Sequence, residues 1–401
     1  MNLLLFITAT LVMGIALEGV FARLRIPWSA GLVVVGFVAS EVVTGLGGDI
    51  GLRWDAVHDI VFFVLLPVLV FEAALNLDVG QLKRHLPMIL VLAVPLLLVS
   101  TAVIALLLRS AIGPGFPWMA ALFAGAILSA TDPVAVLALF RKMGVSPRLA
   151  VLMDGESLFN DATAIVLAAL LLGIAAGAGA PVSVAAATLE FLRVFAGGLA
   201  VGALVGGLLV VLFRVTEEPP ARVGLTVSGA FLAFALAEGV LHLSGVMAVL
   251  AAGLCAAVGL NARREVSRLA HQSWEVMAYL ANGAVFLLMG ATITVAMFSD
   301  RWLAMLMGIG AALVARGAVV FAGIPLANLL PGVEPVPAAF RPILYWGGLR
   351  GAITIALALS IPLEHPWWYT VQAIAYGVVL FTLFVQAPTM PLLLRRTRGL
   401  V

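Results

Sequence analysis

Long apolar stretches recur along the whole chain, and the short stretches between them carry most of its charges. Of the 401 residues, 63% are apolar and 10% are charged, whereas about 25% of the residues in an ordinary soluble domain are charged. Roughly 20 helical residues cross a hydrocarbon core about 30 Å thick. The sequence therefore predicts an all-α polytopic membrane protein. Residues 1–401 are expected to form one membrane domain, with no soluble regulatory domain.

Thirteen segments are predicted to span the membrane. They are residues 2–21, 28–45, 56–77, 86–108, 117–141, 149–176, 182–213, 221–241, 246–261, 272–299, 302–330, 341–362 and 368–394. Positive residues concentrate in cytoplasmic loops, so a correct set of spans separates them into alternate loops. Of the 22 Lys and Arg residues, 16 lie in one set of alternate loops, and three lie in the other, namely Arg53, Arg109 and Arg301. This separation favours thirteen spans with a cytoplasmic C-terminus.

The sequence lacks the motif of a nucleotide-driven pump, a glycine-rich loop that ends in Lys followed by Ser or Thr. The two Lys residues, Lys83 and Lys142, follow Leu82 and Arg141. Any transport is therefore expected to use an ion gradient, and no cofactor is expected. The net charge of +2 does not indicate a nucleic-acid partner, because basic residues gather at membrane boundaries.

The predicted span 117–141 holds Asp132 and Pro133 near its middle, so the carboxylate lies close to the membrane midplane. Pro133 has no N–H for the carbonyl of Ser129, and it disfavours a helical conformation of the preceding residue. The helix is therefore predicted to unwind and to leave carbonyl oxygens beside a carboxylate, which are ligands that a hard cation prefers. The alternative is a kinked helix with a buried, protonated Asp132.

The predicted span 149–176 contains a second carboxylate at mid-depth, Asp161. Residues three, four and seven apart share a helix face, so Asp154, Ser157 and Asp161 form one stripe. Asp161 on this stripe can face Asp132 across the membrane interior. The spacing thus predicts that two carboxylates meet near the midplane.

Glu156 lies on a different stripe, together with Asn160. An unpaired charge at this depth is costly, so Glu156 is expected to have a cationic partner. Arg316 and Arg350 both lie inside predicted spans, and either can fill this role. Such a pair is interpreted as structural rather than as part of the ion path.

Three glycines surround Arg350 in the predicted span 341–362, namely Gly347, Gly348 and Gly351. Glycine is a poor helix former, so this segment is predicted to be a second broken helix. The two broken spans are the fifth and the twelfth, which are seven spans apart. In an inverted repeat with this offset, the two spans run antiparallel to each other. Paired interruptions of this kind indicate a transport site at the midplane, and Arg350 is expected to neutralise the helix C-terminal dipoles there.

Two further acidic residues lie nearer the cytoplasmic ends of their predicted spans, Glu72 and Asp154. Glu72 either lines a cytoplasmic access path or is a solvated residue at the membrane edge. Asp154 either marks an aqueous funnel or caps its helix. The sequence leaves both questions open.

The segments that carry these features are Phe71–Asp78, Thr131-Asp132-Pro133, Gly155–Asp161, Arg316 and Gly347–Gly351. Together they resemble the monovalent cation:proton antiporters of the prokaryotic sodium/proton exchanger branch. The resemblance implies thirteen helices in two inverted six-helix repeats with crossed discontinuous helices, and elevator-type alternating access. It also implies a homodimer in the cell membrane, surrounded by lipid. Core helices are expected around 86–176 and 272–394, and dimerisation or scaffold helices around 1–78 and 182–261.

The family pattern assigns roles to residues of this sequence. It makes Asp161 the shared carrier of cation and proton, next to Asn160 in the Asn-Asp order of the electroneutral branch. The other implied members are Asp132 as a ligand and second proton carrier, Ser157, Thr131 and Glu72 as cation ligands, Asn160 and Pro133 as organising residues, Glu156 with Arg316 as a structural ion pair, and Arg350 as the charge at the helix break.

The predicted function is the one-to-one exchange of a monovalent cation for a proton, and Na⁺ is the favoured cation. The alternatives are a K⁺/H⁺ antiporter and a cation-coupled solute symporter. A channel is disfavoured because selectivity rings contributed by several subunits are not evident. An intramembrane hydrolase is disfavoured because no serine or aspartyl protease motif has a suitable context, so no enzymatic activity is expected.

Overall fold

The structure, a computed structural model, describes residues 3–24, 26–47, 54–177, 183–260 and 264–397. Every regular element within these ranges is a helix, so the all-α prediction is confirmed for the described part of the chain. Four cations used in the charge count lie outside the described residues. They are Arg25, Arg53, Arg263 and Arg398.

The helices follow one another closely along the chain. The first part forms α1 Leu3–Ala16, α2 Glu18–Leu24, α3 Trp28–Gly45, α4 Trp54–Asp59, η1 Ile60–Leu65, α5 Leu66–Asn76, α6 Val79–Ala93, α7 Pro95–Ile112, α8 Trp118–Ser129, α9 Val134–Met143 and α10 Pro147–Ala176. The second part forms α11 Val184–Val215, α12 Pro219–Phe234, η2 Ala235–Val240, α13 Gly245–Leu260, α14 Arg264–Thr292, α15 Val295–Gly317, η3 Ala318–Gly323, α16 Ile324–Ala327, η4 Ala338–Phe340, α17 Arg341–Trp346, α18 Ala352–Leu359, α19 Trp368–Phe381, η5 Thr382–Gln386 and α20 Ala387–Arg396. All η segments except the 3₁₀ turn η4 are π-helical turns between α-helices.

Among the described residues, ten helical segments are long and apolar enough to cross a membrane. The other three predicted spans correspond to the pair α1–α2, bent by 50°, to the 16-residue helix α13, and to the interrupted pair α17–α18. The boundary between the tenth and eleventh predicted spans, 272–299 and 302–330, lies earlier in the chain than predicted. In the structure α14 ends at Thr292 and α15 begins at Val295. Apolar residues continue through this turn, so hydropathy could not locate it. The number of crossings and the inverted repeat stay predictions.

The ends of the helices near the site have local causes. Asp78 caps α6, because its Oδ1 accepts the N–H groups of Gly80 at 2.8 Å and Gln81 at 3.0 Å. α9 ends at Gly144, whose φ of 68° is the left-handed conformation that favours glycine. α8 ends before Pro133, as the missing N–H predicts.

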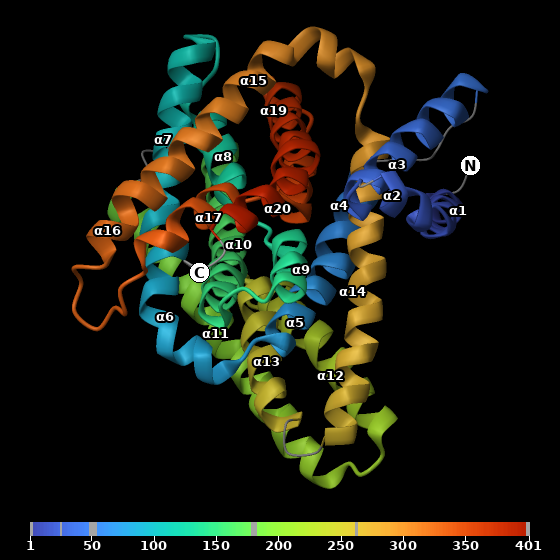
Figure 1. Cartoon of the computed structure of the whole chain (residues 1–401), viewed down its shortest axis with the longest axis vertical. Helices are drawn as coiled ribbons and strands as arrows, with labels where there is room; N and C mark the ends of the chain where they lie inside the picture. The colour runs from blue at the N-terminus through green and yellow to red at the C-terminus, as the bar shows by residue number, and fades with distance from the viewer. Residues whose placement is uncertain (1–2, 25, 48–53, 178–182, 261–263, 398–401) are drawn as a thin grey trace.

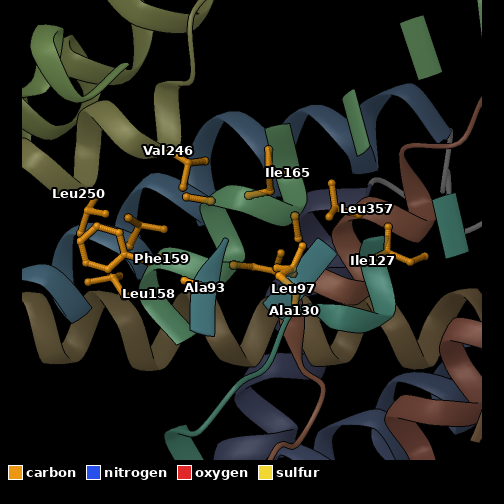
Figure 2. Close-up of a cluster of buried hydrophobic side chains, with 14 of the residues drawn as sticks. Ala93, Leu97, Ile127, Ala130, Leu158, Phe159, Ile165, Val246, Leu250 and Leu357 are labelled. Carbon is orange, nitrogen blue, oxygen red and sulfur yellow. The ribbon is translucent and has the colours of Figure 1, made fainter. Parts of the chain in front are cut away.

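Helix α10 lies in the largest buried cluster of apolar side chains (Figure 2). Its residues Leu158, Phe159 and Ile165 belong to this cluster. The neighbouring helices contribute Ala93, Leu97, Ile127, Val246, Leu250 and Leu357. The polar residues of α10 are therefore held on a helix that is packed on several sides.

The long helix α14 runs along one side of the molecule, with α12 near its beginning and α3 near its end (Figure 1). The contact with α3 is close enough to exclude side chains. A Cβ on Gly36 would lie 2.2 Å from the carbonyl oxygen of Leu287, and a Cβ on Gly290 would lie 2.1 Å from that of Val33. Small residues allow this kind of backbone approach between membrane helices.

Candidate functional site

Two interruptions of the helical backbone meet in the structure. One lies between α8 and α9 at residues 130–133, and the other lies between α17 and α18 at residues 347–351. The N–H of Asp132 donates to the carbonyl oxygen of Leu349 at 2.9 Å. The hydroxyl of Thr354 donates to the carbonyl of Ile127 at 3.1 Å. Segments more than 200 residues apart thus form one junction.

Gly351 allows this close approach. A Cβ at this position would lie 1.8 Å from Oδ2 of Asp132, far inside van der Waals contact. Any other residue would have to displace the carboxylate or the backbone. The glycine that suggested a broken helix in the sequence therefore also leaves room for the acidic side chain.

Arg350 satisfies carbonyl groups at the end of α8. Its Nη1 donates to the carbonyl of Ser129 at 3.2 Å and to that of Ala130 at 2.8 Å. These groups form the negative end of the α8 dipole. The sequence suggested that oxygens freed by Pro133 would be offered to a cation. The structure differs, because the guanidinium group takes these two carbonyls.

Thr382, at the start of η5, holds the backbone of Arg350 in place. Its hydroxyl oxygen accepts the N–H of Arg350 at 3.3 Å and lies 3.1 Å from the carbonyl oxygen of the same residue. A single side chain therefore contacts both polar backbone groups at the centre of the second break. These contacts position the arginine at the junction.

Two side chains of α10 fix the first break. The Nδ2 of Asn160 donates to Oγ1 of Thr131 at 2.7 Å, and its Oδ1 accepts the N–H of Thr131 at 3.3 Å. The hydroxyl of Ser157 donates to the carbonyl oxygen of Thr131. All three residues are buried. The non-helical conformation before Asp132 is thus stabilised by partners outside its own helix.

A pocket of about 80 Å³ lies at this junction. Asp132 and Asp161 both line it, and both are partly buried. Its lining also includes Thr131, Pro133, Ser157, Glu72, Asp154, Asn282 and Thr354. Hydroxyl, carboxylate and amide groups therefore gather around one small space, and these are hard oxygen ligands.

Glu156 faces away from the pocket and contacts Arg316 of α15. The two side chains form a bidentate pair, with Nη2 of Arg316 3.1 Å from Oε2 of Glu156. Arg316 also donates to the carbonyl of Leu344 from Nε at 3.0 Å and from Nη2 at 2.8 Å. The exposed fractions are 3% for Glu156 and 6% for Arg316. Of the two arginines that the sequence offered, the structure thus places Arg316 against Glu156.

A sequence model described as the transmembrane region of sodium/hydrogen exchangers matches residues 7–396. The chain belongs to the sodium/hydrogen exchanger family. A Na⁺/H⁺ antiporter from Aphanothece halophytica, ApNhaP, is 35% identical over 371 residues, which cover 91% of this chain and 68% of that protein. NhaP from Pseudomonas aeruginosa is 33% identical over 395 residues, covering 93% and 92%.

The solved structure of the sodium proton antiporter MjNhaP1 from Methanocaldococcus jannaschii has the same fold. Its TM-score is 0.84 at 19% identity, with 99% of both chains covered. The resemblance predicted from the motifs is therefore confirmed: this exchanger is a prokaryotic monovalent cation:proton antiporter. It is a multi-pass transporter of the cell membrane rather than an enzyme.

The structure of this exchanger adds polar residues that sequence reasoning missed. Asn282 and Thr354 line the pocket, and Thr382 holds Arg350. Asn282 and Thr382 have no recognised motif beside them, and Thr354 follows the Gly347–Gly351 segment by three residues. The available signal was a single polar residue at mid-depth, which by itself does not distinguish an ion path from a helix contact.

Proposed function

We propose that this exchanger moves Na⁺ and H⁺ in opposite directions by letting them compete for Asp161. The observation that supports the proposal is the shared pocket, in which Asp161 and Asp132 lie at the junction of two broken helices. Ser157 and Thr131 add oxygen atoms to the same lining. Carboxylate and hydroxyl oxygens can replace part of the hydration shell of a hard monovalent cation.

The charges around the pocket support a one-to-one exchange. Asn160 precedes Asp161 with a neutral side chain, which is engaged by Thr131. Glu156 is engaged by Arg316. If Asp132, Glu72 and Asp154 keep their charges throughout, Asp161 carries either one proton or one cation, and both loaded forms have the same net charge. The cycle then moves no net charge across the membrane.

The proposal includes an elevator movement. Core helices around 86–176 and 272–394 move relative to a scaffold around 1–78 and 182–261, which also forms a homodimer. Apolar side chains of α11 support contact with lipid or a second copy, because Leu189, Leu204 and Val215 are largely exposed. The charge distribution supports a cytoplasmic C-terminus.

Purified protein in liposomes tests the proposal. An imposed Na⁺ gradient should drive proton movement, followed with a pH-sensitive dye, in the absence of any organic solute. The rate should not change when potassium and valinomycin clamp the membrane at different voltages. Asp161→Asn protein serves as the inactive control.

Each ion is tested separately. Exchange driven by K⁺ but not by Na⁺ would make the protein a K⁺/H⁺ antiporter. A rate that changes with voltage would contradict the one-to-one stoichiometry. If no cation drives proton flux until an organic solute is added, the protein is a cation-coupled symporter instead.

A further inference from the structure

Asn282 brings an amide into the pocket from a helix that carries no acidic site residue. It lies on α14, ten residues before the helix ends at Thr292, and it lines the pocket together with Asp132 and Asp161. Its side chain is partly buried. Within the described part of the chain, no hydrogen-bond partner is found for this amide. Its donor and acceptor groups are therefore available to whatever enters the pocket.

Helix α14 is fixed to helices that we assign to the scaffold. Gly36 and Gly290 bring α14 into backbone contact with α3. The indole Nε1 of Trp274 donates to the hydroxyl of Thr226 on α12 at 2.9 Å. The ring of Trp274 stacks on Phe71 of α5 with 4.4 Å between centroids. These contacts attach the helix that carries Asn282 to α3, α5 and α12.

The lining of the pocket thus comes from two groups of helices. The first break, α10 and the second break supply Asp132, Ser157 and Asp161, while α5 and α14 supply Glu72 and Asn282. The sequence division used in our proposed function counts residues 272–292 with the core, but the contacts of α14 with α3, α5 and α12 assign it to the scaffold. If the core moves relative to the scaffold, Asn282 is near Asp161 in only part of the cycle. Its contribution to binding should therefore depend on the state of the protein.

The size of the pocket leaves room for water around a bound ion. A water molecule occupies roughly 30 Å³ in the liquid, so a pocket of about 80 Å³ holds more than a dehydrated Na⁺ at Asp161. An amide oxygen can ligate the ion or accept a hydrogen bond from its water. Because the amide is neutral, it does this without changing the charge of the loaded site.

The pocket extends along α10 from Asp161 toward Asp154, which lies nearer the N-terminal end of the helix. The charge distribution of the loops places this end on the cytoplasmic side. We propose that Asn282 is a one-sided cation-binding residue, which contributes affinity for ions that arrive from the cytoplasm and loses contact with them when the site opens to the other side. This inference rests on the proposed function above.

The test uses Asn282→Ala in proteoliposomes in which the orientation of the protein has been determined. The KM for Na⁺ is measured separately on each face, with pH held constant. Loss of one hydrogen bond predicts that KM rises roughly three- to tenfold on the cytoplasmic face, with an unchanged KM on the outer face. Gln272→Ala is the matched control, because Gln272 is an exposed amide on the same helix outside the pocket. It should behave as wild type on both faces.

Several outcomes would overturn the inference. An equal rise of KM on both faces would mean that Asn282 acts in both states, and an unchanged KM would mean that it does not bind the ion. The same change in Gln272→Ala would show a general effect on α14. If Asn282→Ala does not fold, Asn282→Ser is measured by the same two-sided assay and judged by the same outcomes. Failure of the wild type to exchange any cation for protons would instead contradict the proposed function.

Discussion

Both ends of the Asn160 amide contact Thr131: Nδ2 donates to the hydroxyl at 2.7 Å, and Oδ1 accepts the backbone N–H at 3.3 Å. An asparagine on an intact helix thereby holds the residue that precedes Asp132 in a non-helical conformation. An aspartate could accept from both groups but could not donate as the amide does. This gives Asn160 a positional role that is separate from its lack of charge.

Asn160→Ala should therefore weaken cation binding without removing any charge from the site. Two lost hydrogen bonds, each worth about 1 kcal/mol, predict a rise in the KM for Na⁺ on the order of tenfold and a lower melting temperature. Asn328→Ala is a matched control, because Asn328 forms a similar pair of bonds with the backbone of Val336 at 2.9 and 3.1 Å. It should lower the melting temperature and leave KM unchanged. A large KM change in both variants would mean that general destabilisation is the cause.

Breaking the pair between Glu156 and Arg316 should destabilise the protein. Removing one partner of a buried ion pair costs about 3–5 kcal/mol, so Glu156→Gln and Arg316→Ala should each lower the melting temperature in detergent. Arg316→Ala should have the larger effect, because it also removes two bonds to the carbonyl of Leu344. The melting temperature of the double variant should fall by less than the sum of the decreases in the two single variants.

A partly exposed ion pair provides the control for this cycle. Arg84 is 67% exposed and contacts Glu334, which also contacts Arg148. Arg84→Ala should therefore change stability by less than about 1 kcal/mol. If the losses of Glu156→Gln and Arg316→Ala simply add in the double variant, the two side chains are not coupled in the folded protein.

Asp161→Asn should abolish exchange while the protein stays folded. The substitution preserves size and removes the group that we assign to both cation and proton. Proton flux in liposomes and the melting temperature in detergent are measured together. Asp300→Asn, at an exposed position of α15 outside this pocket, should exchange normally. Substantial exchange by folded Asp161→Asn protein would move the shared site to Asp132 or Glu72.

Competition at one carboxylate also predicts the pH dependence of exchange. As pH falls, protons occupy Asp161, so the KM for Na⁺ should rise by about tenfold per pH unit once the site is mostly protonated. Turnover should pass through a maximum, because exchange requires both the protonated and the cation-loaded form to cross. A KM that stays constant between acid and alkaline pH would show that cation and proton bind separately.

Gly351→Ala should disrupt the site by steric exclusion. Its Cβ would lie 1.8 Å from Oδ2 of Asp132, and relieving such an overlap typically costs about 1–3 kcal/mol. Exchange should fall by roughly tenfold or more, measured at saturating Na⁺ and again at low Na⁺. Gly310→Ala is the control, since no atom lies within 4 Å of the Cβ it would add. In this helical position alanine should be neutral or slightly stabilising.

Much of the site was visible in the sequence because its causes are local. Pro133 cannot take part in a continuous helix, and the spacing of Ser157 and Asp161 puts both on one face whatever surrounds them. These rules predict a broken segment and a polar stripe at mid-depth from the sequence alone. The structure brings Asp161 and Asp132 to one pocket, as that reasoning predicted.

The remaining features depend on how helices are rotated against each other. Sequence allowed Glu156 to pair with Arg316 or Arg350, because both lie inside predicted spans and only the packing of α15 decides. The sequence placed Arg350 near helix C-terminal ends but did not decide whether the freed carbonyl of Ser129 binds this arginine or an ion. Asn282 was missed for the same reason: nothing near it in the chain indicates which neighbour it faces.

The bond between the N–H of Asp132 and the carbonyl of Leu349 has a consequence for biosynthesis. Asp132 and Asp161 leave the ribosome long before Leu349 and Gly351, so the nascent chain must hold these acidic groups before the second break is present. The pocket becomes complete only when the last part of the protein is inserted. A chain interrupted before residue 347 would therefore enter the membrane with its acidic residues and without a site.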